Sequence, residues 1–155
     1  MRIVLLAIAR LGRAPEAALA RDYADRAAAG GRALGLGPVE LVEIEARKPG
    51  KAAEGAALLA QLAPGDHLVA CDEHGRVRTS RDFSTWIGAL RDRGVRRLVF
   101  VLGGADGLDE AVLARADETL AFGPQTWPHA LARVMLAEQV YRGVSILAGS
   151  PYHRD

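Results

Sequence analysis

Several residue types and patterns are scarce in this sequence. It has one cysteine, Cys71, so no disulfide can form within the chain, and we expect a cytoplasmic protein. No run of 18 apolar residues is present, which excludes a predicted membrane span, and the short apolar run after Arg2 lacks the flanks of an export signal. The net charge is only +1, so no overall basic field attracts nucleic acid. Any polyanion must meet a local patch.

Apolar residues, by contrast, are plentiful and spread along the whole chain. They make up 50% of 155 residues, and a domain of this size can bury about two thirds of the surface that its unfolded chain exposes. The length fits one domain, residues 1–155, with no room for a second.

Strand-like and helix-like segments alternate five times. The predicted strands are residues 2–8, 39–45, 67–71, 97–102 and 118–122. The predicted helices are residues 16–29, 51–63, 80–93, 109–116 and 129–142, with Thr79 or Ser80 capping the third, Asp109 capping the fourth and Gly143 ending the last. This alternation predicts an α/β fold with a mostly parallel sheet flanked by helices on both faces.

Three loops follow the carboxyl ends of predicted strands, where open parallel sheets bind ligands. They are residues 72–75, 103–107 and 123–127. The middle loop lacks the Lys and Ser/Thr of a phosphate cradle and contains Asp106, so a nucleoside with a positive centre is favoured over a phosphate-rich nucleotide. Two plainer interpretations stay open: Gly103-Gly104 as a tight turn, and Asp72 with Glu73 as solvated turn residues.

Other catalytic chemistries have little support. The four histidines lack the spacing of a zinc site, so no metal is predicted, and the G-x-S-x-G elbow of a hydrolase is missing. Cys71 has no redox or metal partner nearby in sequence and is interpreted as a small buried residue at a strand end. In the last helix, Glu138 and Arg142 are spaced to form an ion pair.

The chain ends with an aromatic, an imidazole and a guanidinium in succession: Tyr152, His153 and Arg154. Chain ends are often frayed and inert. If ordered, these three side chains suit single-stranded RNA, because tyrosine can stack on a base, an imidazole exchanges a proton near neutral pH, and arginine holds phosphate. A domain with so little net charge should bind naked RNA weakly, with Arg133, Arg142 or Arg154 among the possible phosphate contacts.

Three segments resemble the ribosomal RNA large-subunit methyltransferase H family of SPOUT methyltransferases. They are LGGADGL (residues 102–108), WPHALARVMLAEQVYRGVSI (127–146) and PYHR (151–154), and the similarity covers essentially the whole chain. The resemblance implies a C-terminal trefoil knot, which composition alone would not suggest. It also implies a homodimer that uses S-adenosylmethionine, without a metal, to methylate N3 of a pseudouridine in 23S rRNA on the ribosome.

The resemblance also assigns site residues. The cofactor site would be formed by Cys71, Gly103 and Gly104 and by Phe122, Gly123, Pro124, Gln125, Thr126 and Trp127. The sequence departs from the family pattern at two places: Cys71 stands where leucine is common, and Phe122-Gly123-Pro124-Gln125 replaces a Ser-Leu-Ser-rich stretch, with Trp127 in place of leucine. We expect cofactor binding to be retained because backbone groups can supply many of the contacts in this loop.

The same resemblance implies that the tail is the catalytic segment. His153 is the expected proton acceptor, with Tyr152 and Arg154 positioning the base and its phosphates. The tail of one subunit is expected to reach the cofactor of the other. Two alternatives remain: a flavodoxin-like nucleotide-binding protein, and a noncatalytic dimeric module associated with the ribosome.

Overall fold

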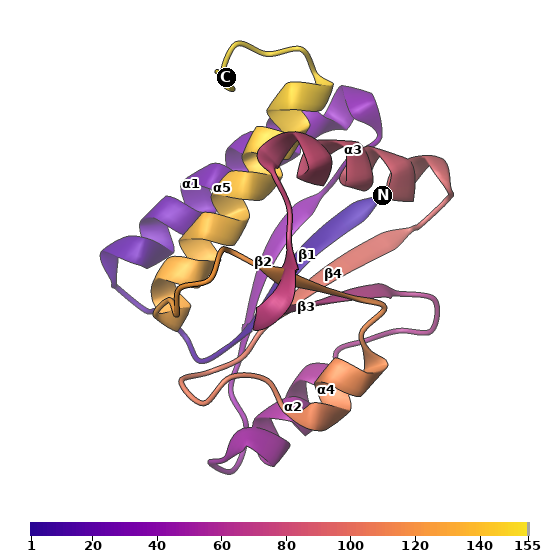
Figure 1. The fold of residues 1–155 in the computed structure, drawn as a ribbon. Coiled ribbons are helices and arrows are strands. Elements are labelled where there is room, and N and C mark those ends of the chain that lie inside the picture. Colours follow the sequence, from indigo (N-terminus) through magenta and orange to yellow (C-terminus); the bar gives the residue numbers. More distant parts are fainter. Residues whose placement is uncertain (155) are drawn as a thin grey trace.

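Five parallel strands form a sheet that lies between two layers of helices (Figure 1). The structure is a computed structural model that describes residues 1–154. The strands are β1 (Arg2–Ile8), β2 (Val39–Ile44), β3 (His67–Val77), β4 (Arg97–Leu102) and β5 (Glu118–Ala121), in the order β2-β1-β4-β3-β5. The helices are α1 (Pro15–Gly31), α2 (Lys51–Leu59), α3 (Ser80–Asp92), α4 (Glu110–Arg115) and α5 (His129–Leu147), with a short 3-10 helix at Arg32–Leu34. The predicted α/β fold is confirmed.

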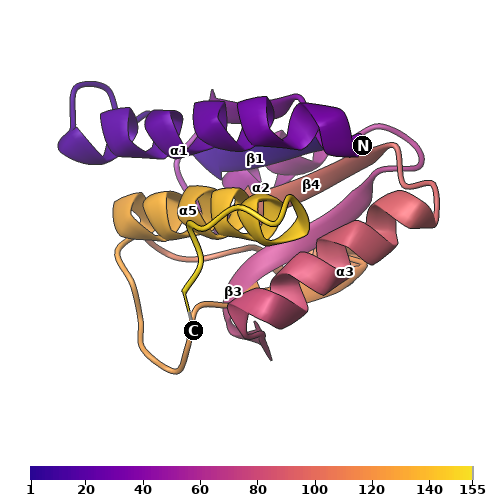
Figure 2. The same cartoon turned by 90° about the horizontal axis from the view of Figure 1, so that it is seen from above.

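Both faces of the sheet are apolar because successive residues of each strand point to opposite helix layers. In β1, Ile3 and Leu5 belong to the core shared with α1, α3 and α5, whereas Val4 and Leu6 belong to the core shared with α2 and α4. Seen from above, α5 lies between α1 and α3 (Figure 2). The nearly continuous apolar runs of β1 and β4 follow from this double coverage.

Two predicted helix caps are present. The Thr79 hydroxyl accepts a hydrogen bond from the Asp82 amide over 3.1 Å at the start of α3. The Asp109 carboxylate accepts one from the Ala111 amide over 2.9 Å at the start of α4. Each cap satisfies an amide that the first turn of a helix leaves without a partner.

The third strand is longer than the sequence suggested. It was expected to end at residue 71, but β3 continues to Val77 with a shift in register, because Cys71 and Arg76 both pair with Leu120 of β5. Residues 72–75 are therefore a bulge within the strand and not a loop beyond it. Glycine is required at Gly75, where a Cβ atom would lie 2.6 Å from the carbonyl carbon of Leu120.

Two predicted helix ends were wrong. The second helix ends at Leu59 instead of residue 63, and α5 continues past Gly143 to Leu147. Gly143 lies against α3: its carbonyl accepts a hydrogen bond from the Ser84 hydroxyl over 2.8 Å, and a Cβ atom there would lie 3.3 Å from Phe83 Cδ1. The glycine therefore allows two helices to approach closely and does not terminate one.

Within residues 1–154, no helix is both long and apolar enough to cross a bilayer. The C-terminal trefoil knot implied by the family resemblance stays a prediction.

Candidate functional site

A cleft of about 620 Å³ lies beside the bulge of β3 and the carboxyl ends of β4 and β5. Its walls come from residues 71–73, 102–107, 122–123 and 125–129, together with Ala132. The three predicted loops therefore meet in one place, as expected for the carboxyl edge of a parallel sheet. The volume lies within the range of about 300–1,000 Å³ that is usual for small-molecule sites. We call this feature the donor cleft.

The donor cleft collects the residues assigned to the cofactor, with one exception. Cys71, Gly103 and Gly104 line it, as do Phe122, Gly123, Gln125, Thr126 and Trp127. Pro124 is not among its lining residues. Sequence reasoning missed Leu102 and the first turn of α5, which contributes His129 and Ala132. Pro128 was a signal that could have located these residues, since it marks the start of α5 directly after the predicted loop at residues 123–127.

The glycine loop is a tight turn as well as a wall of the cleft. Gly104 and Gly107 form an antiparallel bridge, and the Gly107 amide donates to the Gly104 carbonyl over 3.2 Å. A Cβ atom on Gly103 would lie 2.4 Å from the Gly107 carbonyl oxygen. The two interpretations left open for Gly103-Gly104 are therefore compatible, because the turn brings the backbone to the cleft.

Negative charge dominates the lining of the cleft. Asp72, Glu73 and Asp106 contribute carboxylates, whereas none of the described lining residues is Lys or Arg. Thr126 Oγ1 donates to Glu73 Oε2 over 2.9 Å, which joins the bulge of β3 to the loop after β5. Because opposite charges attract strongly in a partly desolvated site, this lining favours a ligand with a positive centre.

Apolar surface completes the cleft. Phe122 and Leu102 supply side-chain walls, and Trp127 is 40% exposed, an unusual condition for so large an aromatic. A planar heterocycle can stack on such surfaces. The cleft therefore combines apolar walls, backbone groups and carboxylates.

Cys71 lies in the cleft as an unreactive thiol. It is half-buried and has no disulfide partner, and burial, followed by the negative charge of Asp72, raises the pKa of its thiol. A raised pKa keeps the sulfur protonated at neutral pH, and the thiolate is the nucleophilic form. This agrees with its interpretation as a small residue at the end of the paired part of β3.

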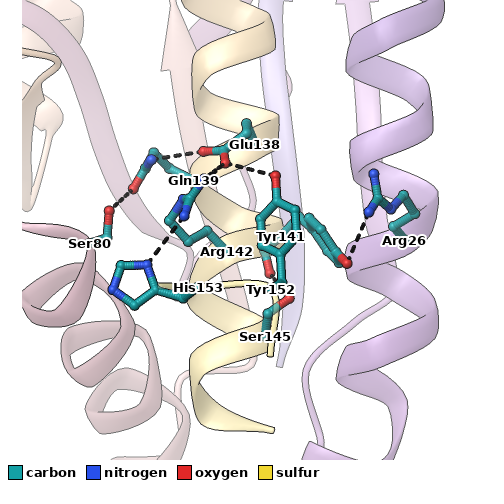
Figure 3. A network of polar contacts seen from close by, with 9 residues as sticks. All are labelled: Arg26, Ser80, Glu138, Gln139, Tyr141, Arg142, Ser145, Tyr152 and His153. Atoms are coloured by element: carbon teal, nitrogen blue, oxygen red, sulfur yellow. Dashed lines mark hydrogen bonds and ion pairs between the residues drawn. The ribbon is translucent and has the colours of Figure 1, made fainter. Parts of the chain in front are cut away.

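The tail folds back onto the C-terminal half of α5 (Figure 3). The Tyr152 hydroxyl donates to Glu138 Oε1 over 3.0 Å, and the ring of Tyr152 lies 4.5 Å from that of Tyr141. Burial, then hydrogen bonding with Tyr23 and Glu138, raises the pKa of Tyr152, so this phenol stays protonated at neutral pH.

A polar network also holds the imidazole of the tail (Figure 3). Arg142 Nη1 donates to His153 Nδ1 over 3.2 Å, while Arg142 Nε donates to Glu138 Oε1 over 2.9 Å. The predicted ion pair between Glu138 and Arg142 is confirmed. The hydrogen bonds to Glu138 raise the pKa of Arg142, so the guanidinium is charged. Arg154, the third predicted catalytic residue, is exposed.

The structure does not bring the tail to the donor cleft of its own subunit. The cleft meets α5 at His129 and Ala132, whereas the tail contacts Glu138, Tyr141 and Arg142. At a rise of 1.5 Å per residue, Ala132 and Arg142 are about 15 Å apart along the helix. Tyr152, His153 and Arg154 are not among the described residues that line the cleft.

Arg133 was wrongly expected to be a direct phosphate contact. It is 3% exposed, and its guanidinium lies inside the molecule against the ends of β1 and β2. Its Nη1 donates to the Ala9 carbonyl over 2.8 Å and to Glu43 Oε1 over 2.9 Å, and its Nη2 donates to the Ile8 carbonyl. Burial lowers the pKa of Arg133, and the Glu43 carboxylate opposes that effect.

Comparisons with known proteins identify the family. A family model described as "Predicted SPOUT methyltransferase" matches residues 1–153. Proteins named ribosomal RNA large subunit methyltransferase H from Caulobacter sp. (strain K31) and Phenylobacterium zucineum (strain HLK1) are each 68% identical over 155 residues, which is the whole of both chains. The protein of that name from Roseobacter denitrificans is 52% identical over 156 residues, again with full coverage. The chain therefore belongs to the SPOUT methyltransferases, in the ribosomal RNA large subunit methyltransferase H family.

Proposed function

We propose that this protein transfers a methyl group from S-adenosylmethionine to N3 of a pseudouridine in 23S rRNA on the ribosome. The observation that carries the proposal is the donor cleft, which gathers all but one of the residues that the family resemblance assigns to the cofactor. The name shared by the full-length relatives supports ribosomal RNA as the substrate. The family match favours this function over a flavodoxin-like one.

The lining of the donor cleft fits S-adenosylmethionine, the methyl donor of this family. The donor carries a positive sulfonium and an ammonium group, and Asp72, Glu73 and Asp106 offer negative charge. Phe122 and Trp127 offer apolar surface for the adenine. When bound, the donor supplies a methyl group on a sulfonium that is ready for displacement.

The protein's main contribution to such a displacement is alignment, because well-placed reactants gain very high effective concentrations. The glycine loop and the Glu73–Thr126 contact fix the walls that set the position of the ligand. His153 then takes the N3 proton of the base, while Tyr152 and Arg154 hold the base and its phosphates. Tyr152 is unsuited to be the base itself, since its raised pKa keeps it protonated.

The hydrogen bond from Arg142 bears on this role of His153. Arginine has only donors, so Nδ1 of His153 accepts in this contact. For that nitrogen to take the N3 proton of the base, Arg142 must release it. Arg142 is therefore a positioning residue that holds the imidazole in place until the substrate is bound.

The same proposal includes a homodimer in which the tail of one subunit serves the donor cleft of the other. The separation of tail and cleft along α5 supports this arrangement. An apolar groove of about 480 Å³ includes Leu19 and Val77, which are 47% and 62% exposed. Large apolar side chains exposed in one groove are typical of a protein contact surface.

We also propose that residues 1–155 act as a single methyltransferase domain in the cytoplasm, where ribosomes are found, and that transfer needs no metal. Titration with Mg²⁺ or treatment with a chelator during methyl transfer tests the last point. A dependence on added metal would contradict it.

The decisive experiment incubates the purified protein with labelled S-adenosylmethionine and with ribosomes from a strain that lacks the enzyme. The nucleosides of the 23S rRNA are then analysed by mass spectrometry. We expect label in one N3-methylpseudouridine. Calorimetry with S-adenosylmethionine tests the alternative of a noncatalytic module, which predicts no binding heat and no competition by S-adenosylhomocysteine. Donor binding without label in any nucleoside would contradict the proposed substrate.

A further inference from the structure

A second pocket, of about 290 Å³, lies beside the donor cleft at the carboxyl ends of β1 and β2. The two cavities are neighbours: Leu102 lines both, while Ala132 lines the cleft and the next residue, Arg133, lines the second pocket. The second pocket therefore opens at the edge of the sheet where the methyl group would be transferred. We call it the arginine pocket.

The charge of the arginine pocket is opposite to that of the donor cleft. Arg10, Arg21 and Arg133 line it, and Glu43 is its carboxylate. Glu43 is already engaged inside the protein, since its Oε1 accepts hydrogen bonds from Arg133 Nη1 and from the Leu11 amide over 2.9 and 3.1 Å. The carboxylate that lines the pocket therefore leaves the positive charges of Arg10 and Arg21 without a partner among the described lining residues.

Arg133 is committed to the protein interior. Its Nη1 and Nη2 are bonded to Glu43 and to the carbonyls of Ile8 and Ala9, and its side chain is almost completely buried. Its Nε has no hydrogen-bond partner among the described residues. The charges open to a ligand are therefore those of the other two arginines.

The two other arginines are exposed and available. Neither Arg10 nor Arg21 forms a side-chain hydrogen bond or ion pair with any other of residues 1–154. The backbone before Arg10 is held in place, because Arg133 binds the carbonyls of Ile8 and Ala9. The guanidinium groups of both arginines are open to an external anion.

We propose that the arginine pocket binds a phosphate group of the ribosomal RNA substrate close to the nucleotide that enters the donor cleft. Arg10 and Arg21 contact the phosphate oxygens, and Arg133 holds the backbone of Ile8 and Ala9 beside them. Guanidinium groups match phosphate oxygens in charge and geometry, which makes arginine the usual residue at such contacts. The proposal rests on the proposed function for the identity of the RNA.

The test measures binding of ribosomes by sedimentation, without methyl donor, at several salt concentrations. We expect Arg10→Ala and Arg21→Ala each to weaken binding about 5- to 10-fold and to lower the slope of log K against log salt by about 1. The matched control is Arg96→Ala, an exposed arginine next to the amino end of β4, on the opposite edge of the sheet. It should bind ribosomes like the unmodified protein. All three variants should bind S-adenosylmethionine unchanged.

Three results would overturn the proposal. The first is unchanged affinity and salt slope for both pocket variants. The second is a loss of S-adenosylmethionine affinity without loss of ribosome binding, which would assign the pocket to the donor. The third is binding of inorganic phosphate that Arg10→Ala and Arg21→Ala weaken while ribosome binding by both variants is unchanged, which would indicate a small-anion site.

The experiment distinguishes a failure of the phosphate site from a failure of the proposed reaction. If the unmodified protein binds ribosomes and the two pocket variants bind them less tightly, the phosphate site is supported even when no methyl group is transferred. In that case the proposed reaction fails and the proposed phosphate contact stands.

Discussion

Arg142 and His153 are joined by a hydrogen bond of 3.2 Å in which the guanidinium donates to Nδ1 of the imidazole. The contact connects the C-terminal half of α5 to the tail. Glu138 binds both Arg142 and Tyr152, so Tyr152 and His153 are held against α5 in the absence of RNA.

His153→Ala should abolish most methyl transfer without disturbing the donor cleft, because the imidazole lies at the tail and does not line that cleft. Loss of a general base typically lowers rates by about 10²–10⁴-fold, so we expect a single-turnover rate at least about 100-fold lower. Calorimetry should give the same S-adenosylmethionine affinity as the unmodified protein. An unchanged single-turnover rate would remove His153 from the mechanism.

Thr126→Ala should weaken donor binding because it removes the hydroxyl that bridges the cleft to Glu73. A hydrogen bond contributes about 0.5–1.5 kcal/mol, so the expected loss of affinity is about 2- to 10-fold, toward the lower end for so exposed a contact. Thr126→Ser is the matched control, since it keeps the hydroxyl and should restore affinity. Equal affinities for the Ala and Ser variants would mean that the contact does not shape the cleft.

Arg133→Met should destabilise the fold because it leaves Glu43 without its ion-pair partner. Breaking a buried pair costs about 3–5 kcal/mol, and we expect about 3 because the Glu43 side chain is still 31% exposed. Urea unfolding measures the loss. Adding Glu43→Leu to the same chain should recover part of it, because the hydrogen bonds from Arg133 to the Ile8 and Ala9 carbonyls remain lost. A double variant no more stable than Arg133→Met would show that the carboxylate is not the cause.

Cys71 should react slowly with iodoacetamide at pH 7.5, because burial and Asp72 raise the pKa of its thiol and so reduce the thiolate fraction. We expect a rate more than about tenfold below that of a free cysteine, rising with pH, and a further decrease with S-adenosylmethionine bound in the cleft. Reaction as fast as that of glutathione would contradict the buried position.

Much of the fold could be predicted because its signals are local. β1 and β4 can be recognised from their own apolar residues alone. Thr79 and Asp109 cap their helices by accepting hydrogen bonds from amides two or three residues away. The donor cleft could be located for a related reason, since parallel strands bring their carboxyl ends to one edge.

The misplaced features depend on partners distant in sequence. Gly143 has the appearance of a helix stop, and only its contact with Phe83, 60 residues earlier, explains a helix that continues. Arg133 suggested a solvent-facing cation, but its partner Glu43 lies 90 residues away. The extension of β3 depends on pairing with Leu120 across the bulge. No local pattern contains this information.

The tail lies near one end of α5 and the donor cleft lies at the other. This separation has a consequence for mixtures of two inactive variants. If each reaction centre draws on two polypeptides, a copy lacking the His153 imidazole and a copy with a blocked cleft, each inert alone, restore one complete centre when they exchange partners. Rescue by mixing two inactive preparations would then report on architecture without any structure of the assembly.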